Sequence, residues 1–263
     1  MGLGKWIGGF LGWMVGGPLG ALAGYFIGSL FEDSSFSIES DGGGYQTGEY
    51  TREQTYQGQR NSFFFSMMVL ASYIIRADGK VMHREMEFVR NFLRVNFGES
   101  AVTQGEQILL KMFEQQKQMN ARNPYAFRTT IQECGAQIAA NMDYSQRLQL
   151  LDFLVRIAQS DGRVASEEIK ALKEVASFMR LSESEVDSML NLKSNTLEDA
   201  YKVLEISPNA TDDEVRKAYR KMALKHHPDK VATLGEDVRK AAEQKFQQIN
   251  DAKERIYKAR GMK

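Results

Sequence analysis

Apolar residues recur every three or four positions along most of the chain, which is the spacing of amphipathic helices. In residues 147–159, RLQLLDFLVRIAQ, an apolar stripe runs through Leu148, Leu151 and Val155. Few segments alternate apolar and polar residues with the period of two that a half-buried strand shows. The pattern therefore predicts an all-α protein, with successive helices across residues 61–193.

The first 31 residues break this pattern, because apolar residues and glycine fill every side of a helix drawn through them. No charged residue lies between Lys5 and Glu32, a run of 26 residues. At a rise of about 1.5 Å per residue, such a helix spans the roughly 30 Å of a hydrocarbon core. We therefore expect residues 1–31 to form a membrane helix. A cleaved signal peptide and a flexible glycine-rich leader are the alternatives.

Glycine occupies every fourth position of this segment from Gly4 to Gly28. On a helix these positions form a stripe without side chains, along which a second backbone approaches closely. The stripe predicts that the anchor forms a homodimer. Lys5 before the segment and Glu32 after it favour a cytoplasmic N-terminus.

Residues 32–60 are rich in Ser, Gly, Gln and Tyr and show no apolar period. This composition is typical of a flexible linker between an anchor and a folded unit. The whole chain contains 34 basic and 34 acidic residues, so we expect no nucleic-acid partner. From Leu197 onward, however, 15 basic residues outnumber 12 acidic ones. The single cysteine, Cys134, excludes an intrachain disulfide and is interpreted as a core residue.

Two segments of the helical unit repeat each other: residues 74–89, IIRADGKVMHREMEFV, and residues 157–172, IAQSDGRVASEEIKAL. The repeat aligns Asp78 with Asp161, Gly79 with Gly162, and Glu85 with Glu168. Each copy predicts a helix, an Asp-Gly turn and a second helix, because glycine can adopt positive φ where the first helix ends. The glutamate lies near the start of the second helix, where negative charge is favourable. We expect two related helical hairpins around one core.

This repeat resembles the tellurite-resistance TerB family, whose all-helical domain carries paired acidic turns of this kind. The resemblance implies a helical bundle over residues 61–193. Some members of that family are thought to bind divalent cations through such turns. Here Asp78, Glu85, Asp161 and Glu168 would do so only if the two turns approach each other in space. Capping and turn formation explain these residues without metal, so we expect no metal site and no cofactor.

A further helical pattern begins at Leu197. In residues 211–214, TDDE, Thr211 caps a helix and Glu214 reaches back to its start. The apolar side of this helix is expected to contain Val215, Tyr219, Met222 and Leu224. Pro228 ends the helix, because the residue before a proline is pushed out of helical dihedral angles.

The opposite side of this helix is basic and leads into a His-Pro-Asp loop. The basic residues are Lys217, Arg220, Lys221 and Lys225, and the loop contains His227, Pro228 and Asp229. Such a loop can dock on a partner, bind a metal or take part in hydrolysis. A zinc site needs about four ligands and a hydrolytic triad needs a positioned nucleophile, and neither is evident. Docking is therefore our interpretation, and His226 is read as one more polar residue at the helix end.

Residues 200–230, AYKVLEISPNATDDEVRKAYRKMALKHHPDK, resemble the J-domain family, and KFQQINDA at residues 245–252 matches the end of that domain. The resemblance implies that residues 197–263 form a helical hairpin that activates ATP hydrolysis by a DnaK-type ATPase chaperone. It also implies that the His-Pro-Asp loop and the basic side dock on this acidic partner. The chain itself is then not expected to be an enzyme.

The order of anchor, TerB-like domain and J-domain resembles the DjlA family of membrane-anchored DnaJ-like co-chaperones. The resemblance implies a single-pass protein of the cytoplasmic (inner) membrane whose J-domain faces the cytoplasm, against the charge argument from Lys5. The Gly/Phe-rich and Cys-rich regions of full DnaJ are missing from the sequence. Client recognition is then expected from the TerB-like domain, and the sequence identifies no client. The alternative is a membrane-tethered stress or metal-sensing adaptor that uses the TerB-like domain as its sensor.

Overall fold

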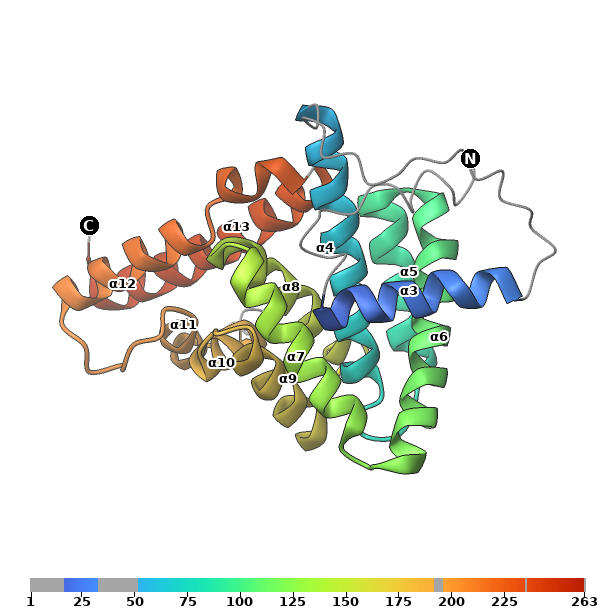
Figure 1. Ribbon diagram of the computed structural model, residues 1–263. Coiled ribbons are helices and arrows are strands. Elements are labelled where there is room, and N and C mark those ends of the chain that lie inside the picture. The colour runs from blue at the N-terminus through green and yellow to red at the C-terminus, as the bar shows by residue number, and fades with distance from the viewer. Residues whose placement is uncertain (1–16, 33–51, 192–195, 235, 263) are drawn as a thin grey trace.

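The computed structural model describes residues 17–32, 52–191, 196–234 and 236–262. Within these ranges all regular elements are helices and no strand is present, which confirms the all-α prediction. Figure 1 shows a bundle of helices and, beside it, a C-terminal hairpin formed by α12 and α13.

The described bundle consists of α4 (Arg52–Ile75), α5 (His83–Phe97), α6 (Glu99–Arg122), α7 (Ala126–Asn141), α8 (Tyr144–Ala158), α9 (Ser166–Phe178) and α10 (Glu183–Asn191). The C-terminal unit consists of α11 (Leu197–Val203), α12 (Asp212–Lys225), the 3-10 helix η1 (Pro228–Leu234) and α13 (Glu236–Arg260). A further helix, α3 (Gly17–Glu32), packs on the bundle from outside.

Helix α4 forms the centre of the bundle, because its apolar residues point in all directions. Phe63, Phe65, Met68, Leu70 and Ile74 are all buried. A helix that is apolar all round is stable only when other elements surround it. Accordingly, α4 contacts α6, α7, α8 and α9.

The two Asp-Gly turns join α4 to α5 and α8 to α9, as the internal repeat predicts. Gly79 and Gly162 have φ angles of +82° and +92°, a region that glycine enters without strain. Helices α4 and α8 pack against each other, and both hairpins contribute to one continuous core. The two related turns and the common core are confirmed, but only α8 and α9 pack on each other as a hairpin, whereas α4 packs mainly on α8 and α6.

Helix α3 differs from the expected membrane helix, because one of its sides is buried by protein. Leu19, Leu22 and Phe26 are buried at three- and four-residue spacing, and α3 contacts α7. The rings of Phe26 and Phe65 lie 6.4 Å apart. The 16 residues of α3 extend over about 24 Å. None of the described helices is both long and apolar enough to cross a membrane. Residues 1–16, with the first four glycines of the stripe, lie outside the described residues.

The predicted linker is shorter than the sequence suggested, because α4 begins at Arg52 and not after residue 60. Gly58 is already buried, and Gln59 and Arg60 are half-buried. Residues 52–60 contain no proline and continue the helix that the following apolar run stabilises. Extending an existing helix is far easier than starting one, so a polar segment beside such a run becomes helical. Residues 33–51 lie outside the described residues.

Candidate partner-docking surface

Helix α12 turns its apolar side toward α13. Val215 and Met222 are buried, and the Tyr219 hydroxyl donates a hydrogen bond to Asn250 of α13 at 2.8 Å. Leu224, expected on this side, is 64% exposed, so that prediction is wrong. The physical reason is its register, since two residues beyond Met222 correspond to about 200° around the helix. The next inward position is 226.

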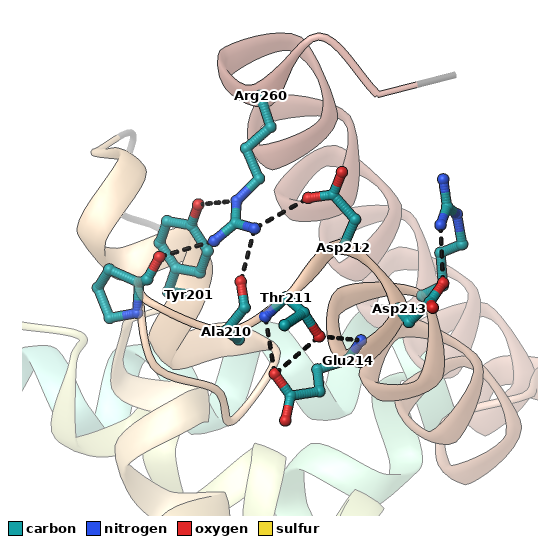
Figure 2. Close-up of polar contacts among 9 residues, drawn as sticks. Tyr201, Ala210, Thr211, Asp212, Asp213, Glu214 and Arg260 are labelled. Carbon is teal, nitrogen blue, oxygen red and sulfur yellow. Dashed lines mark hydrogen bonds and ion pairs between the residues drawn. The ribbon is translucent and has the colours of Figure 1, made fainter.

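The start of α12 has the capping box that the sequence predicts, as Figure 2 shows. The backbone N–H of Glu214 donates to Thr211 Oγ1 at 3.3 Å. In return, the backbone N–H of Thr211 donates to Glu214 Oε2 at 2.7 Å. Two backbone donors that the first helical turn leaves without intrahelical partners are thereby satisfied.

Arg260, the last residue of α13, connects the two ends of the C-terminal unit (Figure 2). Its Nε donates to Tyr201 Oη at 2.5 Å, and its two Nη atoms donate to the carbonyl oxygens of Ala210 and Pro208, both at 2.6 Å. It also pairs with Asp212 of α12 at 3.0 Å. No local sequence signal marks this residue, because its partners lie 48 to 59 positions earlier in the chain.

The His-Pro-Asp loop follows α12 and presents two polar side chains to solvent. The side chains of His227 and Asp229 are 44% and 83% exposed. His227 Nδ1 accepts the backbone N–H of Asp229 at 3.3 Å. The His227 ring also packs edge-on against Phe246 of α13, at 5.7 Å between ring centroids. The loop is thus supported by α13, while its imidazole and its carboxylate remain accessible.

The predicted basic side of α12 divides into two parts. Lys217, Arg220 and Lys221 are exposed beside the loop. Lys225 is not, since its Nζ lies 3.0 Å from Glu185 Oε1 of α10 and its side chain is only 17% exposed. The structure therefore places three of the four predicted cations on an open face and the fourth in a contact with the bundle.

The two neighbouring histidines have opposite surroundings. His227 reaches solvent, whereas His226 is buried. Burial and the nearby Lys245 ammonium lower the pKa of His226 to about 3, so its imidazole is neutral at pH 7. His226 does end α12, as expected, but nothing in the sequence indicated that its side chain is buried. Because His226 is buried and Asp229 is exposed, the two do not belong to one common ligand set.

A buried ion pair lies beside His226. Lys245 Nζ of α13 is 2.7 Å from Asp152 Oδ1 of α8, and the two side chains are 1% and 9% exposed. Arg156 Nε approaches the other carboxylate oxygen at 2.8 Å. Burial acts to raise the pKa of Asp152, but Lys245 and Arg156 hold that pKa below its usual range. No sequence pattern signals this pair, whose members lie 93 residues apart.

Each glutamate of the repeat caps its helix as predicted. Glu85 Oε2 accepts the backbone N–H of Met82 at 2.9 Å, and Glu168 Oε2 accepts that of Ala165 at 2.7 Å. The turn aspartates act in the same local way. For example, Asp161 Oδ1 accepts the backbone N–H of Arg163 at 3.1 Å.

The two acidic turns also approach each other, which the sequence left open. Arg84 of the first turn donates from Nη1 to the carbonyl oxygen of Asp161 in the second, at 3.4 Å. Burial, together with the carboxylates of Glu168, Asp78 and Asp161, raises the pKa of Glu85 to about 7. Within the described ranges, no group of three or more His, Cys, Asp or Glu residues is arranged to hold a metal ion.

Cys134 lies fully buried in α7. Its burial raises the pKa of the thiol to about 12, so almost no reactive thiolate forms at neutral pH. This confirms its interpretation as a core residue.

Three family models match successive parts of the chain. Residues 1–44 match the co-chaperone DjlA transmembrane domain, residues 65–191 match the tellurite resistance protein TerB, and residues 199–260 match the DnaJ domain. The N-terminal match assigns the first residues to a membrane anchor of the DjlA type. The J-domain match includes α12, the His-Pro-Asp loop and α13.

Full-length similarity extends to curated co-chaperones. The co-chaperone protein DjlA of Coxiella burnetii is 27% identical over 99% of this chain and 98% of its own length. That of Photobacterium profundum is 26% identical over 99% of both chains. The human DnaJ homolog subfamily C member 7 is 42% identical over 66 residues, which cover 25% of this chain and 13% of that protein. No solved structure matches the chain.

These similarities differ in how much of the chain they cover. A match to the J-domain alone shows a shared domain, whereas a match over the whole chain shows a shared domain order. The human protein shares only a segment of J-domain size, whereas the DjlA proteins share the whole length and the order of all three parts. The chain is therefore DjlA-like over its whole length, and its successive parts match a DjlA-type anchor, a TerB domain and a C-terminal DnaJ domain.

Proposed function

We propose that this co-chaperone stimulates ATP hydrolysis by a DnaK-type chaperone, and that its His-Pro-Asp loop docks on that partner. One observation carries the proposal: His227 and Asp229 reach solvent beside the exposed cations Lys217, Arg220 and Lys221. The ATPase site belongs to the partner, so the chain acts as an activator and not as an enzyme.

The chemistry of this surface suits an acidic partner with an arginine near its centre. The exposed cations attract negative charge during approach, and they mainly raise the rate of association. Asp229 can then pair with an arginine at close range, where both charges lose water and the contact becomes specific. Pro228 restricts the backbone of the loop, so less conformational freedom is lost on docking.

The decisive experiment measures ATP hydrolysis by a purified DnaK-type chaperone with added full-length co-chaperone in detergent. His227→Gln keeps a side chain of similar size, yet it should abolish stimulation. His83→Gln is the matched control, because His83 is exposed at the start of α5 and should change nothing. Circular dichroism must show native helix content in both variants. Full stimulation by His227→Gln would overturn the proposal.

We further propose that the TerB-like domain recognises a client or a signal. An open pocket lies between α4, α6, α7 and α9, with the rings of Tyr73, Tyr125 and Phe127 and the cations of Arg76 and Lys170 in its lining. Tyr125 is 70% exposed, and exposed aromatic residues are enriched where proteins bind each other. Tyr125→Ala should reduce the recovery of co-purifying proteins while ATPase stimulation remains. Unchanged recovery would exclude this pocket from client binding.

For the anchor, we propose a single crossing of the cytoplasmic membrane, with the J-domain in the cytoplasm and a homodimer through the glycine stripe. The uncharged run after Lys5 and the DjlA-type match support the crossing, which requires that α3 leave its packing on α7. Protease added to intact spheroplasts should leave the C-terminal unit uncut, and lysis should expose it. Cleavage before lysis would reverse the orientation. Joint replacement of Gly12, Gly16 and Gly20 by Leu should reduce crosslinked dimers.

A further inference from the structure

The J-domain is held against the TerB-like domain by polar contacts on both sides of its loop. They are Lys245 Nζ to Asp152 Oδ1 (2.7 Å), Lys225 Nζ to Glu185 Oε1 (3.0 Å), Ser145 Oγ to the Lys225 carbonyl (3.2 Å) and Ser188 Oγ to the Val203 carbonyl (2.8 Å). Between them η1 contacts α4 and α8, and α13 contacts α5 and α8. Figure 1 shows the C-terminal hairpin against this side of the bundle.

The charged groups of this interface are almost fully buried. Glu185, Asp152 and Lys245 are 3%, 6% and 1% exposed. Removing two charges from water cancels much of their mutual attraction, so well-packed apolar residues of similar volume often hold such an interface as well or better. Among the described residues, the buried Nδ1 of His226 has no hydrogen-bond partner, an unfavourable state that access to water would relieve. Opening of the interface would relieve these buried polar groups, although it would also expose Val203, Leu204 and Val231, which are buried in one core with the bundle.

One residue belongs both to this interface and to the proposed docking surface. Lys225 lies one helical turn after Lys221 on the basic side of α12. Its side chain is 17% exposed, compared with 65% for Lys221. Its ammonium group contacts Glu185 of the TerB-like domain at 3.0 Å and Glu205 of the J-domain at 3.6 Å, and it lies 5.4 Å from the centre of the Tyr144 ring. A chaperone that uses Lys225 must therefore displace the TerB-like domain from it.

We propose that the TerB-like domain is an intramolecular inhibitor of the J-domain. In the closed arrangement, Glu185 and Asp152 hold the basic helix and α13, and the docking surface lacks Lys225. Separation of the two domains releases Lys225 from Glu185 and leaves Glu205 as its partner, which Lys225 shares with the exposed Lys221. This inference rests on the proposed docking function of the J-domain and adds to it a regulated state of the same site.

The test uses the full-length protein with three variants of the buried pair. Asp152→Asn leaves the buried Lys245 without its carboxylate, and Lys245→Met leaves Asp152 with Arg156 alone, so both variants should open the interface. The half-maximal concentration for ATPase stimulation should then fall about fivefold, as expected when one exposed charge contact worth about 1 kcal/mol is gained. The double variant replaces the pair by two neutral side chains, leaves only the less deeply buried Arg156 without its carboxylate, and should return toward the wild-type value. Asp187→Asn, on an exposed ion pair of α10, is the control and should change nothing.

Hydrogen exchange of the amides in η1 and α13 reports opening independently of ATPase activity. Both single variants should exchange faster there, and the double variant should not. Faster exchange with an unchanged half-maximal concentration would overturn the inhibitor role, and so would unchanged exchange in both single variants. Adding His227→Gln to Asp152→Asn should abolish stimulation. If stimulation persisted, the docking function would fail, whereas the exchange data would still decide whether the domains open.

Discussion

Two regions of the TerB-like domain bury carboxylates, and their surroundings give these acids opposite properties. Asp152 on α8 faces the cations of Lys245 and Arg156, which hold its pKa below the usual range. Glu85 at the start of α5 is buried close to other carboxylates, Glu168 among them, and its pKa is raised to about 7. Burial alone favours the protonated form of both acids. The cations beside Asp152 therefore outweigh its burial, whereas for Glu85 burial prevails and the neighbouring carboxylates add to it.

Buried charges therefore have opposite effects at two contacts of this molecule. Around Asp152, opposite charges from two domains attract each other, so the J-domain is held in place. Around Glu85, like charges from two hairpins of one domain repel each other, so the approach of the two acidic turns is weakened as pH rises. Both contacts join residues that are far apart in the sequence, 93 positions for Asp152 and Lys245.

The largest effect on stability is expected when Lys245 is replaced, because Asp152 then becomes a buried carboxylate with one cation fewer beside it. Lys245→Ala should lower the free energy of unfolding by about 3 kcal/mol, near the lower end of the range for breaking a buried pair, because Arg156 remains. Chemical denaturation of the full-length protein measures this loss. Lys173→Ala removes a more exposed partner of Asp187 and should cost less than about 1 kcal/mol. Equal losses in the two variants would contradict the expectation that the buried ion pair contributes more to stability than the exposed one.

Asp229 differs from both buried acids, because it is exposed in the free protein and is expected to be buried only in the complex with the chaperone. Asp229→Asn should weaken productive docking by about 2–5 kcal/mol, a factor of roughly 30 to several thousand. The concentration dependence of ATPase stimulation measures it. Asp213→Asn is the matched control, because Asp213 and Asp229 side chains are both 83% exposed. A comparable loss in Asp213→Asn would show that general negative charge, and not the loop, matters.

Glu85 predicts a pH dependence with a definite sign. Its pKa rises from 4.5 in the unfolded chain to about 7 in the folded protein. Between these values the folded state binds a proton that the unfolded chain has released, so stability falls as pH rises through this window. Glu85→Gln keeps an oxygen for the Met82 N–H and removes the charge. It should be more stable than wild type at pH 8, by on the order of 2 kcal/mol, and similar at pH 4.

Thermal unfolding at several pH values tests this expectation, with the exposed Glu87→Gln as control. Parallel pH profiles for wild type and Glu85→Gln would contradict it. A divalent cation that stabilised the wild-type protein at pH 8, but not Glu85→Gln, would instead support the metal-sensing adaptor.

The smallest effects are expected for the exposed cations of α12. Lys217→Ala and Lys221→Ala should each weaken ATPase stimulation by less than about 1 kcal/mol, because solvent screens exposed pairs. The loss should shrink as salt increases from low to physiological concentration. A loss that did not depend on salt would show that these lysines make buried contacts in the complex.

The sequence predicted local structure correctly wherever the residues that determine a cap, a turn or a helix end lie within a few positions of it. The capping box at Thr211, the positive φ of Gly79 and Gly162 and the end of α12 before Pro228 are of this kind. So are the helices themselves, because periodic apolar residues define a side that must be buried. The His-Pro-Asp loop was located in the same way, since its residues are adjacent in the chain.

Tertiary structure decided which polar residues are buried and what they face. The sequence by itself could not distinguish Lys225, bound to Glu185, from the exposed Lys221, because both stand on the basic side of one helix. Nor could it show that one side of α3 packs on α7, since an apolar segment can be covered by lipid or by protein. The physical reason is that desolvation and Coulomb energy depend on distances between distant segments, which only the packing of the helices sets.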